Sequence, residues 1–261
     1  MGVTHPEPIK RKSQVRMAFQ PVVDISTGEV FAYEALVRGA NGEGAAEILA
    51  RVAPHQRHNF DMHCRVAAIR TAVALGINDG NAMLAINFMP DAIESPIEDG
   101  HRTVEIAEHF GLSPRRLMFE FSDHDNVDPH RLGEIIRVYR RCGFMTTFED
   151  FSAVSVGLGL LGQFSPDYIK LDAGLIGGIA ASWSRRLIVE SLMDLAKALR
   201  IKVIAEGVET AGDMDRMRAY GIDYFQGYFL AEPELEALPA FDKRKSRPDS
   251  GYKQAAAARA R

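Results

Sequence analysis

The chain has 261 residues, of which 46% are hydrophobic and 25% charged, and its formal net charge is −4. This composition is typical of a globular protein with a sizeable core, and we expect one barrel-sized domain over residues 16–242. The charge balance gives no basic field, so we expect neither DNA nor RNA as a partner. No run of 18 apolar residues occurs and the first ten residues lack an apolar signal core, which favours a cytoplasmic protein without a membrane span.

The two ends of the chain are basic and poor in apolar residues. We expect residues 1–15 to form an N-terminal tail and residues 243–261 to form a disordered basic tail. The two cysteines, Cys64 and Cys142, fall on separate predicted helices and show neither a disulfide framework nor a paired metal spacing. A reducing compartment fits this cysteine usage.

Strand-type apolar runs alternate with helical periodicity along the chain. Residues 17–24 and 29–39 are predicted strands, and the turn signal Ser26-Thr27-Gly28 between them predicts a hairpin. The alternation that follows argues for parallel β/α units. In chain order it predicts helices at 45–51 and 59–75, a strand at 83–88, a helix at 103–110, a strand at 116–122, a helix at 129–141, a strand at 144–151, a glycine-rich loop with a short helix, a strand at 167–172, a helix at 182–199, a strand at 202–208, a helix at 211–220 and a strand at 223–229.

Nearly every predicted strand carries, near its end, a polar side chain that a strand core does not need. A charge buried without a partner at such a position would be costly. Because the carboxyl ends of all strands meet on one face of a β/α barrel, we expect these side chains to converge. Carboxylates that meet with amide groups and an ammonium group suit Mg²⁺ or Mn²⁺. The residues are Glu34, Asn87, Glu120, Glu149, Asp150, Lys170, Asp172, Glu206 and Gln226.

Eight short segments over residues 17–241 resemble the EAL domain family in order and spacing. They read FQPVVD, EALVRG, AINF, FEFSD, FEDF, YIKLD, VIAEGVET and QGYF. The resemblance implies a TIM-like (β/α) barrel with one antiparallel strand, which fits the predicted hairpin. It also implies hydrolysis of one phosphodiester of cyclic di-GMP to linear pGpG with two divalent cations, Mg²⁺ or Mn²⁺. Two cations can stabilise both the entering and the leaving oxygens of an in-line displacement.

The resemblance also implies a role for individual side chains. Lys170, Glu206 and Glu34 would be catalytic, with Lys170 placing the attacking water. Arg38, four residues after Glu34 on the same strand face, would clamp a phosphate. The first cation would be held by Glu34, Asn87, Glu120 and Glu149. The second would be held or bordered by Glu149, Asp150 and Glu206. The ligand would be contacted by Gln20, Arg38, Asp172 and Gln226.

The sequence departs from the family pattern in one loop and its brace. The family has Asp-Asp-Phe-Gly-Thr/Ala-Gly where this chain has EDFSAV from Glu149 onward. Glu149 lengthens the carboxylate arm by one methylene, about 1.5 Å, and a misplacement near 1 Å can cost about 10²-fold in rate. Ser152 and Val154 replace glycines, and valine is strained wherever φ is positive. Asp123, which with Ser152 is expected to brace this loop, replaces a glutamate.

Two hypotheses therefore stay open. The first is an active, metal-dependent cyclic di-GMP phosphodiesterase, and Lys170, Glu206 and Gln226 favour it. The second is a catalytically inactive EAL domain that acts as a cyclic di-GMP receptor or protein-interaction regulator, and the diverged loop favours it. The resemblance implies a homodimer. We expect regulation to come from another protein, from dimerisation or from the expression level.

Overall fold

The computed structural model describes residues 15–122, 128–151, 164–177, 179 and 182–246, with the backbone alone at positions 122, 150, 151 and 246. The proposed loop braces Asp123 and Ser152, the glycine-rich loop with its short helix, and the outer parts of both tails lie outside the described residues.

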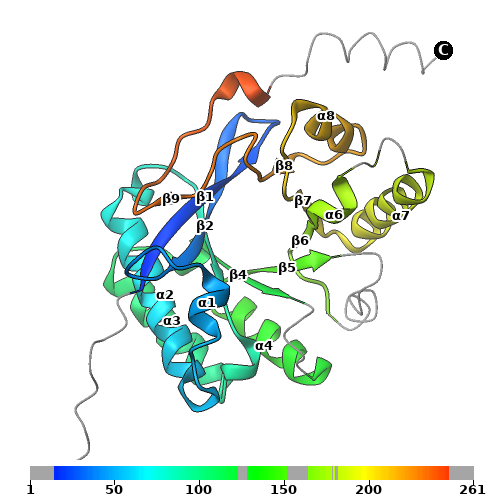
Figure 1. Ribbon diagram of the computed structural model, residues 1–261. Coiled ribbons are helices and arrows are strands. Elements are labelled where there is room, and N and C mark those ends of the chain that lie inside the picture. The colour runs from blue at the N-terminus through cyan, green and yellow to red at the C-terminus, as the bar shows by residue number, and fades with distance from the viewer. Residues whose placement is uncertain (1–14, 123–127, 152–163, 178, 180–181, 247–261) are drawn as a thin grey trace, which may run out of the picture.

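A closed barrel of β-strands forms the centre of the molecule (Figure 1). Strands β2 to β8 follow one another in chain order and are parallel, whereas β1 closes the barrel between β8 and β2 and is antiparallel to both. This confirms the predicted TIM-like barrel with one antiparallel strand. The strands are β1 (Arg16–Asp24), β2 (Glu29–Arg38), β3 (Met83–Asn87), β4 (Leu117–Ser122), β5 (Met145–Phe151), β6 (Tyr168–Leu171), β7 (Lys202–Ala205) and β8 (Tyr224–Phe225), and β9 (Glu234–Leu235) pairs with β1.

The predicted hairpin of β1 and β2 is confirmed. Its turn is held by Asp24, whose Oδ1 accepts hydrogen bonds from the backbone N–H and the hydroxyl of Ser26. Gly28 closes the turn with φ of 69°, a conformation that glycine adopts without steric cost.

Helices cover the outside of the barrel (Figure 1). The helix expected over residues 103–110 begins earlier, at Pro96, because Ser95 accepts a hydrogen bond from the Glu98 N–H and proline is favoured in the first turn. The helix expected over 129–141 is confirmed at both ends. The described helices are α1 (Ala45–Leu49), α2 (Arg57–Ala74), α3 (Pro96–His109), α4 (Pro129–Arg141), α6 (Ala173–Ile176), α7 (Trp183–Leu199) and α8 (Ala211–Ala219). Short 3₁₀ turns lie at Pro54–Gln56, Ile77–Asp79, Pro90–Ala92, Pro114–Arg116 and Lys243–Ser246.

The prediction of a strand over residues 223–229 is wrong in its length, because β8 is shorter and ends at Phe225. After Gln226 the chain reaches Gly227, with φ of 155°, where a side chain would lie 2.2 Å from the Val208 carbonyl oxygen. The close approach of two backbones therefore ends the strand. The strand expected over residues 202–208 is also shorter than predicted, since β7 ends at Ala205 and Glu206 lies just beyond it.

None of the helices in the described ranges is both long and apolar enough to cross a membrane.

Candidate active site

The strand period of two places the polar side chains of the site directly above an apolar layer. Ala32, Ala85, Met118 and Tyr168 belong to one buried apolar cluster inside the barrel. Two residues further along the same strands come Glu34, Asn87, Glu120 and Lys170. Because alternate residues of a strand point to the same face, the four polar side chains enter the barrel at its carboxyl end.

Lys170 of β6 lies at the centre of this polar group. Its Nζ donates hydrogen bonds to Glu34 Oε2, Glu120 Oε2 and Glu149 Oε1, each at 2.9 Å. The Lys170 side chain is fully buried. Burial would lower the pKa of Lys170, but the charges of Glu120, Glu149, Glu34 and Glu206 outweigh it and raise this pKa well above its usual range. Lys170 is therefore a fixed ammonium group.

The three carboxylates around Lys170 differ in their proton affinity. Burial opposes ionisation of Glu34, but Lys170 and the hydrogen bonds from Gln226 and Asn87 outweigh it and lower the pKa of Glu34. For Glu120, burial dominates and the charges of Glu34 and Glu149 add to it, so that the pKa of Glu120 is raised well above its usual range. Burial likewise raises the pKa of Glu149. The one ammonium group of Lys170 is thus shared by three carboxyl groups, and Glu120 and Glu149 hold a proton more tightly than an ordinary glutamate does.

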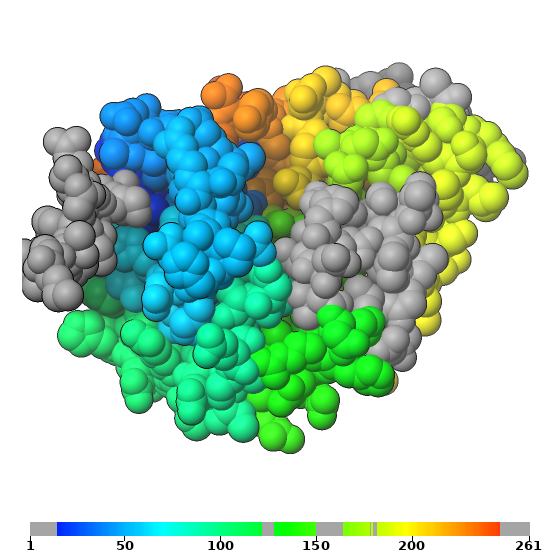
Figure 2. Space-filling model, turned by 60° about the horizontal axis from the view of Figure 1, so that its bottom comes forward, coloured from blue at the N-terminus to red at the C-terminus, as the bar shows by residue number. Residues whose placement is uncertain are grey.

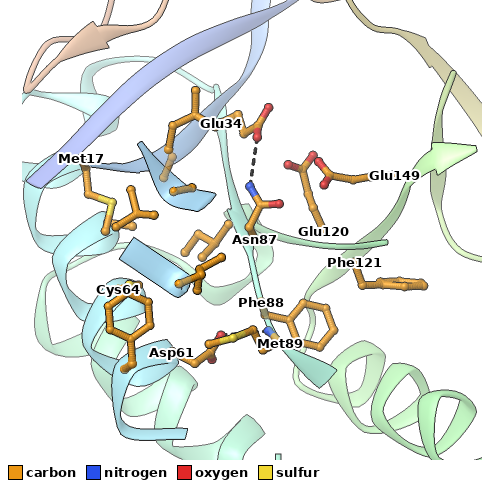
Figure 3. Close-up of a pocket in the computed structure, with 18 residues that line it drawn as sticks. Met17, Glu34, Asp61, Cys64, Asn87, Phe88, Met89, Glu120, Phe121 and Glu149 are labelled. Atoms are coloured by element: carbon orange, nitrogen blue, oxygen red, sulfur yellow. Dashed lines mark hydrogen bonds between the residues drawn. The ribbon is translucent and has the colours of Figure 1, made fainter. Parts of the chain in front are cut away.

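Amide side chains orient Glu34 from two sides. Asn87 Nδ2 donates to Glu34 Oε1 at 3.0 Å, as the dashed line in Figure 3 shows. Gln226 Nε2 donates to Glu34 Oε2 at 2.6 Å and also contacts Gln20 Oε1 at 3.3 Å. Gln20 in turn donates to the Ala231 carbonyl oxygen at 3.1 Å. Glu34 is therefore held in one orientation.

The donor set fits a divalent cation. Glu34, Glu120 and Glu149 each offer a carboxylate oxygen, and these three atoms lie within 4.8 Å of one another. Within the described part of the chain, Glu120 Oε1 is buried and accepts no hydrogen bond. A buried carboxylate oxygen without a partner is costly, and a hard cation would satisfy it.

A pocket of about 310 Å³ opens beside the carboxylates. Figure 2 shows the molecule hollowed between the blue segments and the yellow and orange segments. Figure 3 shows that Glu34, Asn87, Glu120 and Glu149 point toward one another at one end of the pocket, and that apolar side chains line the other. A ligand with charged and flat apolar parts would match these two ends.

The structure brings most of the predicted site residues together. Glu34, Asn87, Glu120, Glu149, Lys170, Gln226 and Gln20 form the contacts above, and the charge of Glu206 acts on Lys170. Arg38 and Asp172 lie at the carboxyl ends of β2 and β6. In the described ranges Arg38 forms no salt bridge, and its Nη1 donates to the Val37 carbonyl oxygen at 2.9 Å. Asp150 lies in β5, and its side chain is outside the description.

The model of one family, described as "EAL domain", matches residues 6–233. The chain belongs to the EAL domain family. The expected family is thereby confirmed over most of the chain.

Curated EAL relatives from Escherichia coli (strain K12) are longer than this chain. The blue light- and temperature-regulated antirepressor BluF is 26% identical over 224 residues, which cover 85% of this chain and 55% of BluF. The probable cyclic di-GMP phosphodiesterase PdeN is 26% identical over 238 residues, which cover 85% of this chain and 44% of PdeN. The chain thus spans about half the length of these relatives.

Solved EAL structures share the fold of this chain. A standalone versatile EAL protein from Vibrio cholerae O395, in its c-di-GMP-bound form, is 37% identical with a TM-score of 0.85, and the match covers 91% of this chain and all of that one. Klebsiella pneumoniae BlrP1, in a manganese and cyclic di-GMP complex, is 29% identical with a TM-score of 0.81, and the match covers 91% of this chain and 60% of BlrP1.

A buried charged pair beside the pocket of this EAL domain was missed by the sequence reasoning. Asp61 and Arg65 of α2 are 5% and 0% exposed, and Asp61 lines the pocket (Figure 3). The sequence feature that could have indicated them is an acidic and a basic residue four positions apart in a predicted helix with many apolar residues. An i, i+4 pair is usually a surface feature, so the spacing alone did not indicate burial.

Proposed function

We propose that this EAL domain is a metal-dependent phosphodiesterase that hydrolyses cyclic di-GMP to linear pGpG. The observation that carries the proposal is the convergence on Lys170 of three carboxylates from β2, β4 and β5, of which those of Glu34 and Glu120 are buried and that of Glu149 is partly buried. A cluster of this kind is costly for folding and has no evident structural purpose, whereas it matches the donor set of a hard cation.

The relatives support the choice of substrate. The solved Vibrio cholerae and Klebsiella pneumoniae EAL structures contain cyclic di-GMP, the latter with manganese, and PdeN is a probable cyclic di-GMP phosphodiesterase. The pocket of this chain joins a carboxylate-lined end to an apolar end. The carboxylate-lined end would face a phosphate through cations, and the apolar end would receive a base.

The chain offers ligands for two divalent cations, Mg²⁺ or Mn²⁺. Bound there, the cations would supply Lewis acidity at the phosphate and lower the pKa of the attacking water. The neutral amide of Asn87 adds no charge to the site and so leaves a cation more electrophilic than a further carboxylate would. The first cation would be held by Glu34, Asn87, Glu120 and Glu149. The second would be held or bordered by Glu149, Asp150 and Glu206.

Lys170 would orient water and balance charge rather than accept a proton. Its pKa is raised well above the usual range, so it carries no free lone pair at neutral pH. All three of its N–H donors go to carboxylates, so Lys170 would orient a water once a cation drew one of these carboxylates away. We assign catalytic roles to Lys170, Glu206 and Glu34.

The remaining polar residues at the barrel mouth would bind the nucleotide. Arg38 is half-buried, with one guanidinium nitrogen committed to the Val37 carbonyl oxygen, and its other donors could grip a phosphate in the two-point manner of guanidinium groups. Gln20, Gln226 and Asp172 would contact the ligand. We further propose that the domain is cytoplasmic and forms a homodimer, and that a protein partner regulates it.

A turnover assay tests the proposal. Purified protein is incubated with cyclic di-GMP and Mn²⁺ or Mg²⁺, and the nucleotides are separated over time. We expect pGpG as the product, with formation stopped by a chelator and by Asn87→Ala. Absence of pGpG at high protein concentration, with an intact fold, would overturn the proposed reaction.

A second candidate function is a cyclic di-GMP receptor or protein-interaction regulator without turnover. One relative, BluF, is an antirepressor, and Glu149 stands where the family pattern has aspartate. Equilibrium dialysis with cyclic di-GMP distinguishes the two functions, because a receptor retains the intact ligand whereas an enzyme converts it.

A further inference from the structure

A buried polar network joins three helices beside the candidate active site. Arg65 of α2 is fully buried, and its Nη1 donates to Asp99 Oδ2 at 2.8 Å and to Thr103 Oγ1 at 2.7 Å, both on α3. The hydroxyl of Tyr139 on α4 donates to the same Asp99 oxygen at 2.6 Å. Arg65 Nη2 donates to Asp61 Oδ2, one helical turn back on α2. The network thus fixes the orientation of the Asp61 carboxylate.

The other oxygen of Asp61 reaches the chain just beyond β3. Asp61 Oδ1 accepts the backbone N–H of Met89 at 3.0 Å, and Figure 3 shows the two residues side by side. Met89 lies between β3 and the 3₁₀ turn that begins at Pro90, so neither element provides an acceptor for its N–H. One residue earlier, the Phe88 N–H donates to the Glu120 carbonyl oxygen at 3.1 Å.

These two hydrogen bonds fix the backbone on the carboxyl side of Asn87. Asn87 is the last residue of β3 and faces Glu120 in the register of β3 and β4. The direction of its side chain therefore depends on how residues 88 and 89 leave the strand. The Arg65 guanidinium also lies 5.0 Å from the centre of the Phe119 ring, one residue before Glu120. The network thus supports both strands at the positions of candidate cation ligands.

We infer that Asp61 is a positioning residue for Asn87, with Arg65 fixing Asp61 in turn. The inference rests on the proposed function, in which Asn87 binds a cation. A purely stabilising role explains the network less well, because a buried ion pair adds little stability over apolar residues of similar volume. Groups that orient a cation ligand typically change metal affinity by about 10–100-fold when they are altered.

The variant Asp61→Asn tests the inference. An amide that presents its oxygen to Arg65 must turn its NH₂ group toward the Met89 N–H, so that two donors face each other and the Met89 hydrogen bond is lost. Tyr139→Phe is the matched control, since it removes one hydrogen bond from the same network at the end remote from Met89. In ¹⁵N-labelled, metal-free protein, we expect Asp61→Asn to shift the side-chain amide resonances of Asn87 and Tyr139→Phe to leave them in place.

Mn²⁺ titration of the same proteins gives the second readout. We expect Asp61→Asn to weaken Mn²⁺ binding by about 10–100-fold, as altered orienting groups do, and Tyr139→Phe to leave it unchanged. Unshifted Asn87 amide resonances in Asp61→Asn, or equal effects of the two variants, would overturn the inference. If the wild type binds no Mn²⁺, the proposed function fails, whereas the Asn87 resonances still decide the positioning role.

Hydrogen exchange of the wild type keeps the inference testable if Asp61→Asn does not fold. The Met89 amide lies outside helices and strands, so its protection depends on Asp61. We expect it to exchange slowly, at a rate similar to that of the neighbouring β3 amides. Exchange as fast as in an exposed loop would contradict the inference.

Discussion

Lys170 Nζ lies 2.9 Å from Glu149 Oε1, so that the ammonium group of β6 and the carboxylate of β5 meet inside the barrel. Glu149 is the residue that is one methylene longer than the family pattern. The contact shows that this longer arm still reaches the centre of the candidate active site. Glu149 also belongs to the carboxylate set that a cation could share.

Replacing Lys170 by methionine should destabilise the metal-free protein. Glu34, Glu120 and Glu149 would lose their common partner, and removal of one member of a buried ion-pair group typically costs about 3–5 kcal/mol. Mn²⁺ should then raise the melting temperature of Lys170→Met more than that of the wild type, because the cation replaces the lost charge. Scanning fluorimetry with and without Mn²⁺ measures both effects.

Lys197→Met is the matched control for this experiment, since Lys197 is an exposed lysine in the last turn of the outer helix α7. Its effect should stay within about 0.5 kcal/mol, as for most surface changes. Equal melting temperatures for Lys170→Met and the wild type would contradict the central position of Lys170.

Glu120→Gln should change stability and cation binding in opposite directions. Because burial and two neighbouring carboxylates raise the pKa of Glu120, its neutral form is favoured and glutamine resembles that form. At pH 8 we expect the metal-free variant to gain about 1 kcal/mol, or ~2–4 °C in melting temperature. The stabilisation by Mn²⁺ should disappear. The exposed Glu29→Gln is the charge-matched control and should show neither effect.

Cation binding should release a proton and tighten as pH rises. The folded-state pKa of Glu120 is raised, so between the unfolded and folded values the folded state holds a proton that the unfolded state lacks. The free energy of unfolding of the metal-free protein therefore falls as pH rises through this interval. A cation needs the ionised carboxylate and so displaces the proton. Calorimetric Mn²⁺ titrations in two buffers of different ionisation enthalpy measure the proton release. Identical apparent binding enthalpies in the two buffers would argue against proton release.

Cys64 should be unreactive in the folded protein. Burial, with a smaller contribution from the Asp61 charge, raises the pKa of Cys64 to about 12. At pH 8 only about one thiol in 10⁴ is then ionised, and the thiolate is the form that reacts. Iodoacetamide should therefore label Cys64 slowly in native protein and rapidly in urea, as peptide mass spectrometry would show. Fast labelling in the native state would contradict the raised pKa of the half-buried Cys64.

Much of the fold was predictable because local signals and strand periodicity agreed. Ser26-Thr27-Gly28 marked the hairpin, and the helix expected over residues 129–141 is α4 with the same bounds. The short β8 was not predictable, because it ends where Gly227 packs against the backbone of Val208, and no local pattern reports such a long-range contact.

The candidate active site was predictable as a set of residues but not as a geometry. Polar residues at strand ends identified Glu34, Glu120 and Lys170. The sequence could not show that one ammonium group is shared by three carboxylates, because that depends on barrel closure. The pair Asp61 and Arg65 was missed because its burial results from the packing of α2 against α3 and α4.

The most direct test of the central claim is the rate of pGpG formation from cyclic di-GMP in the presence of Mn²⁺, compared between the wild type and Glu34→Ala. Glu34 contacts Lys170, Asn87 and Gln226, so its removal takes away a proposed cation ligand and the hydrogen bonds that join these three side chains. Glu29→Ala on the exposed start of β2 is the control. The account predicts pGpG from the wild type and the control, and none from Glu34→Ala. Intact cyclic di-GMP with all three proteins, or equal rates with all three, would contradict it.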